Sequence, residues 1–530
     1  MTLYWGRDRI RHRMLRFTES KSAKPARENY THGLAREDYY TEGQEIAGRW
    51  HGKGAERLGL HGVVTRDAFM ALCENERPDG SGRLTAKKVK NRRVGYDLNF
   101  HCPKSLSLLH AETGDPAILD AFRESVRETM EEMEGAMKTR VRQGGVSEDR
   151  DTGNMTWAEF VHYTARPVDG LPDPHLHAHC FVFNATHDPV EETWKAGQFG
   201  PLLKDASYYE AAFHARLAGR LKEMGYPIER TAKGWELAGV PPSLLERFSR
   251  RTAEIEALAG ERGITDARRK DALGAQTRQR KAKQLDYGEL RQTWRDRMGE
   301  AERAALSTLN ENRGTQNRAA PESKEVLEQS LDHLLERNSV IPEKRLLAEI
   351  LRRGVGDYSV EKARRALRDP DLLVRERDGE QLVTTKKLLA EEREMIAYAR
   401  ASRGTCRPLH RGEVEFQDER LNDQQRRAVE HVLKSPDRLM GIRGGAGVGK
   451  TTLMREAVGG IERGGKQVFT FAPSAEASRK VLREEGFYNA ETVQKLLADK
   501  ELQAQTRGQV IWIDEAGLLG AQQMKRVFDI

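Results

Sequence analysis

The stretch 172–184, PDPHLHAHCFVFN, places three histidines at alternate positions and then continues into apolar residues that favour β-strands. Successive side chains of a strand point to opposite faces, so His175, His177 and His179 would project from one face. Such a row is either the polar face of a strand or a set of metal ligands. The stretch therefore predicts a half-buried strand of a sheet, with candidate ligands on one side.

The bulk composition narrows the class of protein. A chain of 530 residues is too long for one core and suggests three or four domains. No window approaches 18 to 20 uncharged apolar residues, so we expect no membrane insertion. The first residues, MTLYWGRDRIRHRMLRF, lack the apolar segment of a secretory signal. The net charge of +7 is compatible with nucleic-acid binding without requiring it.

Cysteine usage indicates the compartment. The four cysteines form no CxxC pair, which argues against a disulfide scaffold or a cysteine-based zinc site. We therefore expect a protein of the reducing cytoplasm.

Periodicity predicts the elements before residue 300. Residues 154–166, NMTWAEFVHYTAR, have the pattern of a strand, and residues 115–141 have that of one long amphipathic helix. Charged helices follow from about 241 to 298. The polar, breaker-rich residues 309–324 are typical of a linker.

The next segment predicts three helices and a hairpin. Residues 326–369 give the helices, and residues 372–385 give a hairpin whose Asp378–Gly379 favours a tight turn. This combination suggests a small winged-helix module, with a plain helical spacer as the alternative. After about residue 408, alternating strands and helices indicate an α/β domain.

That last domain contains a phosphate-binding loop. Residues 439–454, LMGIRGGAGVGKTTLM, predict an apolar strand, a glycine loop and a helix, with the G-x-x-x-x-G-K-T pattern. Backbone amides of such a loop hold phosphates, its lysine reaches the β/γ oxygens, and its threonine binds Mg²⁺. We expect ATP to be bound with Mg²⁺ by Gly444, Gly447, Gly449, Lys450, Thr451 and Thr452.

A second apolar strand completes the nucleotide site. Residues 508–519, GQVIWIDEAGLL, end the strand with Asp514 and Glu515. These two residues are expected to hold Mg²⁺ and to activate the attacking water.

Motifs around the loop add a resemblance to a known family. LNDQQRRAV (421–429), VFTFAPSAEASRKVL (468–482), ETVQKLL (491–497) and DEAG (514–517) resemble the early motifs of RecD-like superfamily 1 helicases. The resemblance covers about residues 415–530 and implies an adenine contact from Gln424 or Gln425. The family's second motor domain and arginine finger would lie beyond Ile530. It therefore implies an incomplete helicase that binds ATP without unwinding DNA, from a truncated product or a fragment of a longer protein.

The N-terminal motifs carry a second resemblance. Residues 37–62 (EDYYTEGQEIAGRWHGKGAERLGLHG), 92–109 (RRVGYDLNFHCPKSLSLL) and 153–184 resemble the relaxase domain of the MobF, TrwC-like class of conjugative proteins. That family carries a RecD-like helicase after its relaxase, and the order of domains here agrees.

The resemblance assigns the histidines. It implies that His162, His177 and His179 bind a divalent metal, Mg²⁺ or Mn²⁺ with Zn²⁺ as an alternative, and spacing alone keeps His175 in reserve. Three imidazoles leave coordination positions for a phosphate oxygen and water. It also implies that Asp97 accepts a hydrogen bond from a ligating histidine. This chain has two more residues than the family pattern between His162 and the later pair.

Tyrosines are the candidate nucleophiles. A phenolate can attack a phosphodiester, and a 3′-hydroxyl can reverse the step. Tyr30, Tyr39 and Tyr40 are otherwise ordinary core or surface aromatics. The resemblance implies that Tyr30 makes the first cleavage and that Tyr39 or Tyr40 makes a second transfer.

The combined prediction is a relaxase of the bacterial cytoplasm. It would nick one strand at a transfer origin, stay on the 5′ end as a phosphotyrosine and later rejoin the strand. The implied partners are single-stranded DNA, accessory relaxosome proteins and a type IV coupling protein. Basic segments 85–93 and 250–270 are candidates for phosphate contacts.

The expected fold combines three parts: an α+β relaxase domain of HUH type, an antiparallel sheet with helices; a winged-helix module; and a partial α/β P-loop domain. The expected boundaries are a basic tail at 1–13, the relaxase at 14–300, a linker at 301–323, the winged helix at 324–404 and the P-loop domain at 405–530. The alternatives are a rolling-circle replication initiator, a metallohydrolase and a non-catalytic DNA-binding remnant.

Overall fold

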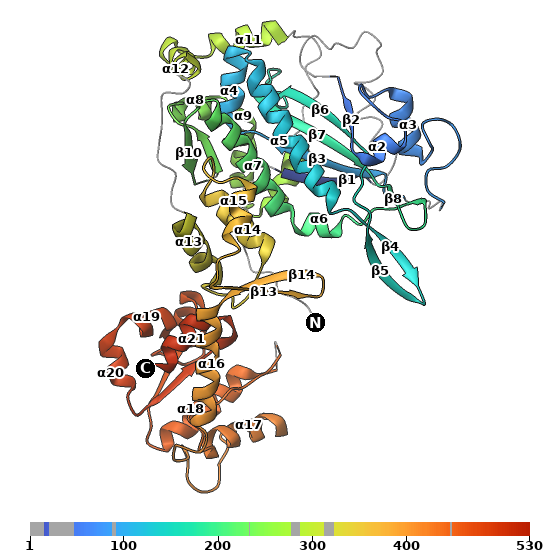
Figure 1. The fold of residues 1–530 in the computed structure, drawn as a ribbon. Coiled ribbons are helices and arrows are strands. Elements are labelled where there is room, and N and C mark those ends of the chain that lie inside the picture. The colour runs from blue at the N-terminus through green and yellow to red at the C-terminus, as the bar shows by residue number, and fades with distance from the viewer. Residues whose placement is uncertain are drawn as a thin grey trace. The chain divides into compact units, whose positions relative to one another are not determined.

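The computed structural model describes residues 15–20, 47–86, 92–232, 234–276, 287–311, 323–445 and 448–530 (Figure 1). Its contacts divide the chain into two compact units. The first contains the described residues up to Leu327 together with Lys344–Leu367, and the second contains Glu328–Glu343 and Arg368–Ile530. Among the described residues, no helix has the length and apolar composition needed to cross a membrane.

An antiparallel sheet of five strands, in the order β1-β3-β7-β6-β2, is the framework of the first unit. Its central strand β7 (Pro174–Phe183) lies between β3 (Gly95–His101) and β6 (Trp157–Thr164). β1 (Leu15–Ser20) and β2 (Arg49–His51) form the two edges. The sheet confirms the strands predicted around the histidines and the α+β class of this part.

The two faces of the sheet are filled differently. The residues that alternate with the β7 histidines are all buried: Leu176, Ala178, Cys180 and Val182. α4 (Lys104–Thr113) packs against β7, and α5 (Pro116–Gly135) packs against α7 (Ala206–Glu223). These apolar residues leave the opposite face of the strand to the histidines.

An aromatic core covers the histidine-bearing face of the sheet at the C-terminal end of β7. Phe69 of α3 (Arg66–Glu74) contacts Phe181 and Phe183, which follow the histidines on β7 at the same alternate spacing. α2 (Lys53–Arg57) contacts β2 beside this core. One end of the face is therefore packed, while His162 and His179 are only partly buried at the other.

Helix α5 is shorter than predicted. The expected helix over 115–141 ends at Gly135, and the chain continues into β4 (Lys138–Gln143). Glycine weakens a helix because it loses more backbone freedom than other residues. Thr139 and Val141 are buried while the residues between and after them are exposed, which is the two-residue period of a strand.

The remaining elements of the first unit lie around the sheet and its helices. They are β5 (Val146–Asp151), β8 (Thr186–Asp188), β9 (Thr193–Lys195), α6 (Gly200–Lys204), β10 (Ile228–Thr231), β11 (Gly234–Leu237), α8 (Pro242–Arg247), α9 (Arg250–Glu261), α10 (Ala267–Gln276), α11 (Tyr287–Asp296), α12 (Glu300–Glu311), α14 (Glu343–Arg353) and α15 (Val360–Ala366). Helix α12 occupies the start of the segment 301–323 that we expect to be a linker, so that expectation is wrong for residues up to 311.

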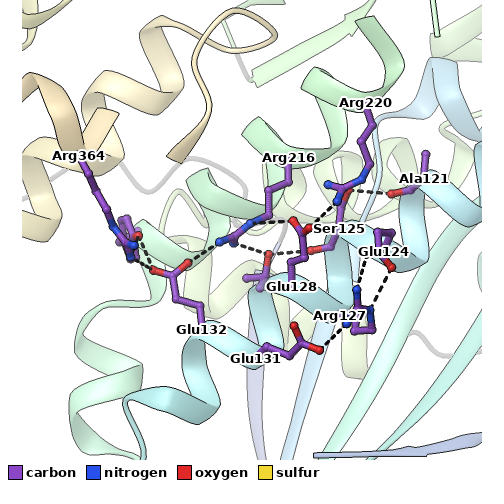
Figure 2. Close-up of polar contacts among 12 residues, drawn as sticks. Ala121, Glu124, Ser125, Arg127, Glu128, Glu131, Glu132, Arg216, Arg220 and Arg364 are labelled. Carbon is purple, nitrogen blue, oxygen red and sulfur yellow. Dashed lines mark hydrogen bonds and ion pairs between the residues drawn. The ribbon is translucent and has the colours of Figure 1, made fainter. Parts of the chain in front are cut away.

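Ion pairs hold α15 to the first unit. Figure 2 shows Glu132 of α5 between two guanidinium groups, those of Arg216 on α7 and Arg364 on α15. The nitrogen–oxygen distances are 2.7 Å and 2.6 Å. Arg220 reaches Glu128 one turn away at 2.7 Å. The helices α5, α7 and α15 therefore form one packed group.

The second unit begins with a small sheet. β12 (Ile341–Pro342) pairs with β14 (Glu380–Thr385), which pairs with β13 (Leu372–Arg377). Asp378 and Gly379 both have positive φ, 54° and 74°, as the predicted tight turn requires. The hairpin and the helices α13 (Ser323–Leu335), α14 and α15 are confirmed as elements, while their assignment to a winged-helix module stays a prediction.

The rest of the second unit is α/β, as predicted. Its parallel sheet has the order β16-β15-β17. The elements are α16 (Lys386–Ala401), α17 (Asp423–Lys434), α18 (Lys450–Arg463), β15 (Val468–Ala472), η1 (Glu476–Leu482), β16 (Glu491–Thr492), α19 (Val493–Ala498), α20 (Lys500–Thr506), β17 (Val510–Ile513), η2 (Ala516–Leu518) and α21 (Ala521–Phe528).

One strand of this unit was predicted and is not formed. Residues 439–445 before the phosphate loop adopt neither helix nor strand, and Leu439 and Ile442 are 40% and 39% exposed. A strand needs a neighbour with which to form its ladder of hydrogen bonds. β15 already has β16 and β17 on its two sides, and no described strand pairs with this segment.

Candidate active site and phosphate loop

Three imidazoles meet on one face of the first unit's sheet. His162 of β6 lies opposite His177 in the register of β6 and β7, and His179 follows two residues later on β7. The ring centres are 5.2 Å apart for His162–His177, 5.1 Å for His162–His179 and 5.2 Å for His177–His179. The rings therefore mark the corners of a nearly equilateral triangle, and the structure brings together the three histidines that the family resemblance assigns as ligands.

Hydrogen bonds determine which ring nitrogens face the triangle. Asp97 of β3 places its carboxylate 2.9 Å from Nδ1 of His179. Nδ1 of His177 lies 2.9 Å from the carbonyl oxygen of His175. Because both acceptors are oxygens, each Nδ1 carries the proton and each Nε2 keeps its lone pair.

The charge state of His177 suits a ligand. Burial, followed by the neighbouring imidazoles, lowers the pKa of His177 well below its ordinary value. The ring is therefore neutral near pH 7, which is the form that binds a metal ion.

The trio fits a divalent ion in donor type and spacing. Imidazoles that share one ion through bonds of about 2.1 Å place their ring centres roughly 4.5–5.3 Å apart. The observed spacing falls in this interval. Among the described residues, no group of three or more His, Cys, Asp or Glu side chains already has the geometry of a formed metal site. Ligation would thus require small rotations of these rings toward a common point.

The phosphate loop is the second candidate site. Gly449 begins α18 with a left-handed φ of 78°, and the following Lys450 donates from Nζ to the carbonyl of Gly444 at 3.2 Å. Lys450 Nζ also lies 3.7 Å from Glu515. The lysine therefore spans from the loop to the end of β17, where the predicted carboxylates Asp514 and Glu515 stand. Thr451 and Thr452 occupy the first turn of α18 and are partly exposed.

Of the two glutamines left open by the sequence, Gln425 is the one that contacts the loop. Its Nε2 donates to the carbonyl of Val448 at 3.1 Å, and its Oε1 accepts from the backbone of Asn422. This second bond is half of a capping box at the start of α17. Gln424 is exposed.

Comparison with known proteins identifies the family. The family model for TrwC relaxase matches residues 23–301, more than half of the chain. The chain belongs to the TrwC relaxase family. A second family model, for an AAA domain, matches residues 420–530. The resemblance to a relaxase followed by a helicase-like domain is thereby confirmed.

The curated relatives are much longer than this relaxase-family chain. The multifunctional conjugation protein TraI of Escherichia coli is 34% identical over 278 residues, which are 51% of this chain and 15% of the relative. TraI of Escherichia coli strain K12 is 32% identical over 343 residues, which are 61% of this chain and 19% of the relative. The chain thus spans less than a fifth of the length of these relatives.

Solved structures of TrwC are also similar. The copper-bound relaxase TrwC in complex with oriT DNA has 29% identity and a TM-score of 0.48, covering 56% of this chain and 98% of that one. TrwC complexed with a 27-mer DNA of recognition hairpin and cleavage site has 27% identity and a TM-score of 0.47, with the same coverage.

Several of the residues predicted for the relaxase lie outside the described part of the structure. These are the three candidate nucleophiles Tyr30, Tyr39 and Tyr40, the basic tail 1–13, and all three lysines of segment 85–93. Gly447 of the phosphate loop also lies outside it. Their assignments stay predictions.

The sequence did not reveal what holds the turn between the two ligand-bearing strands of the relaxase. Asp173, buried just before β7, accepts from Arg250 Nε at 3.0 Å and from Arg297 Nη1 at 2.9 Å. Trp294 Nε1 donates to the carbonyl of Pro172 at 2.9 Å. These partners are 77 to 124 residues away from the turn, so no local pattern could have indicated them.

The same contacts change the interpretation of the second basic segment. Within 250–270, Arg250 pairs with Asp173, Arg251 with Glu254 and Lys270 with Glu256. Three of the cations expected to bind DNA phosphates are thus already engaged with carboxylates, which weakens the case for this segment as a DNA contact.

Proposed function

We propose that this protein is a conjugative relaxase, which nicks one DNA strand at a transfer origin and later rejoins it. The observation that carries the proposal is the trio His162, His177 and His179 with Asp97 hydrogen-bonded to His179, in a chain of the TrwC relaxase family. A three-imidazole site with open coordination positions suits a phosphodiester substrate.

The chain's own residues would prepare the scissile phosphate. Nε2 of His177, Nε2 of His179 and the ring of His162 would hold a divalent ion, Mg²⁺ or Mn²⁺ with Zn²⁺ as the alternative, and Asp97 would fix the tautomer of His179. The bound ion would supply Lewis-acid polarisation of the phosphate. The sheet would fix the ligands, because all three imidazoles stand on the paired strands β6 and β7.

A tyrosine would supply the nucleophile. The phenol oxygen of Tyr30 would attack phosphorus, forming a P–O bond to the 5′ end while the bond to the 3′ oxygen breaks. The phenol loses one proton and the departing 3′ oxygen gains one, so the step conserves charge and bond energy. Attack by the 3′-hydroxyl reverses it, and Tyr39 or Tyr40 would serve a second transfer.

The remaining parts would serve the same process. The P-loop unit would bind ATP with Mg²⁺ through Lys450, Thr451 and Asp514, with Gln425 beside the adenine and Glu515 activating water. The proposed substrate is single-stranded DNA at a transfer origin, in the bacterial cytoplasm. Accessory relaxosome proteins and a type IV coupling protein are the proposed partners.

The covalent intermediate provides the decisive test. The full chain, incubated with single-stranded origin DNA and a divalent ion, should leave a free 3′-hydroxyl and a 5′ protein–DNA adduct. Peptide mapping of the denatured adduct should place the DNA on Tyr30. Tyr30→Phe should remove most of the adduct, because it deletes only the phenol oxygen. Tyr39→Phe or Tyr40→Phe should spare first cleavage and impair rejoining.

Variants of the trio test the metal. His177→Ala and His179→Ala should each abolish nicking, whereas His61→Ala, which removes an exposed imidazole of the same unit, should not. Cleavage without any tyrosine adduct would contradict the covalent mechanism. Full nicking by both trio variants in EDTA would contradict the metal's part in it.

A further inference from the structure

Two more histidines stand on the same sheet face. His101 ends β3 and His175 is the second residue of β7, and in the β3–β7 register His101 lies opposite His177. Nδ1 of His101 and Nε2 of His175 are 3.0 Å apart, and both rings are partly exposed. The proposed nicking chemistry uses neither ring.

The spacing of these two nitrogens fits a metal ion. An ion bound through two bonds of about 2.1 Å at a right angle places its ligand nitrogens about 3.0 Å apart. This is the separation of neighbouring corners in octahedral or square-planar coordination. The two rings come from different strands, so the backbone pairing of β3 with β7 holds them at this distance.

The pair is distinct from the trio. His177 stands between the two groups: its ring centre is 4.8 Å from that of His175 and 5.5 Å from that of His101. Its Nδ1, however, is engaged with the carbonyl oxygen of His175, which leaves its Nε2 for the trio. The nitrogens of the pair share a hydrogen bond with each other, and a metal ion bound by both rings would take the place of the shared proton.

We propose that His101 and His175 form a second divalent-metal site, separate from the trio. Two imidazoles favour a late first-row ion, such as Cu²⁺, Ni²⁺ or Zn²⁺, over Mg²⁺, which prefers oxygen ligands. Water or a phosphate oxygen fills the remaining positions. The ion links the end of β3 to the start of β7 and places a second positive charge on the face that carries the trio. A DNA strand lying on this face would meet two cations, one on each side of His177.

Metal counting on the full chain tests the proposal without any nicking assay. The protein is stripped with EDTA and titrated with Ni²⁺ by calorimetry. His101→Gln keeps a hydrogen-bonding side chain of similar size but removes the imidazole, so it should bind one ion fewer than the wild type. His175→Gln should lose the same ion, and His61→Ala should lose none.

A double variant that lacks two of the trio's imidazoles distinguishes metal binding by the pair from metal binding by the trio. His162→Ala/His179→Ala should retain the ion bound by the pair, and adding His101→Gln should remove it. Cu²⁺ bound to the double variant should give an electron paramagnetic resonance spectrum with two nitrogen ligands. The proposal is overturned if His101→Gln and His175→Gln bind as many ions as the wild type, or if His101→Gln removes nothing from the double variant. Unfolding midpoints measured in EDTA confirm that each variant is folded.

Discussion

Asp97 would act on the proposed metal site through its carboxylate, both oxygens of which lie within hydrogen-bond distance of His179 Nδ1. Asp97→Asn keeps the shape but removes the negative charge that holds the proton on Nδ1. Loss of such a carboxylate weakens metal binding by about 10- to 100-fold. Calorimetric titration with Mn²⁺ should show this loss in Asp97→Asn and none in Asp169→Asn, which changes an exposed carboxylate in the β6–β7 turn. Equal dissociation constants for wild type and Asp97→Asn would contradict this role.

His214 makes the stability of the first unit depend on pH. Burial, with a smaller contribution from Arg352, lowers the pKa of His214 to about 3 from an ordinary 6.5. Its Nδ1 accepts from Trp235 Nε1 at 3.1 Å, a bond that an imidazolium cannot accept. Below pH 6.5 the unfolded chain therefore binds a proton that the folded chain does not. The free energy of unfolding should fall as the pH drops from 6.5 toward 3, by up to about 1.4 kcal/mol per pH unit.

Urea denaturation in EDTA between pH 7 and 5 measures this slope. His214→Gln should flatten it, because the amide oxygen can still accept from Trp235 and does not titrate. His431→Gln, which removes an exposed histidine of α17, should leave the slope unchanged. An identical slope in wild type and His214→Gln would show that this residue is not the source.

Single residues also show how far the sequence can predict the site. The two-residue period of a strand places His175, His177 and His179 on one face, and the family resemblance selects His177 and His179 and adds His162 and Asp97. The bond between His101 and His175 depends on the register of two strands whose residues are 74 positions apart. Register is a property of the folded sheet, so no local pattern indicated the pair.

At the scale of elements, the β6–β7 turn is held by ion pairs with residues that lie far away in the sequence. Asp173→Asn leaves the guanidinium groups of Arg250 and Arg297 without their carboxylate, and losing one partner of a buried ion pair costs about 3 kcal/mol or more. The turn joins the strands that carry the trio, so metal affinity should fall together with stability. Asp149→Asn on the exposed β4–β5 hairpin is the control. Urea denaturation measures the free energy of unfolding, and Mn²⁺ titration measures the metal affinity. An unchanged free energy of unfolding in Asp173→Asn would contradict the stabilising role of its ion pairs with Arg250 and Arg297.

Elements whose environment is local were predicted better than those that need a distant neighbour. The hairpin at Asp378–Gly379 was predicted because its turn chemistry is contained in two residues. The strand expected at 439–442 has the right composition but no described partner, so it does not form. Helix α5 was extended too far because an amphipathic pattern continues past Gly135, where the chain instead pairs with β5.

At the scale of the whole molecule, the two candidate sites draw on separate units. All residues of the histidine trio precede residue 180, and Lys450 belongs to the second unit. Lys450→Ala removes the charge that reaches the phosphates and should weaken ATP binding by about 10- to 100-fold. Single-strand nicking should be unchanged. Lys434→Ala, an exposed lysine of α17, should preserve both properties. Fluorescent nucleotide titration and a nicking assay on the same preparations test the separation, and a parallel loss of nicking would contradict it.

The order of the units along the chain determines what happens when a protease cuts the polypeptide once. The polypeptide passes from one unit to the other three times, because Lys344–Leu367 belongs with the first unit while the residues on either side of it belong with the second. A protease that cuts between α12 and α13 cuts within the first unit, before all three of these passages, and leaves them in the C-terminal fragment. The C-terminal fragment then still carries α14 and α15, which are tied to the N-terminal fragment by Arg364 to Glu132 and Lys344 to Asp205. The two halves would behave as a split protein that reassembles through its own helices.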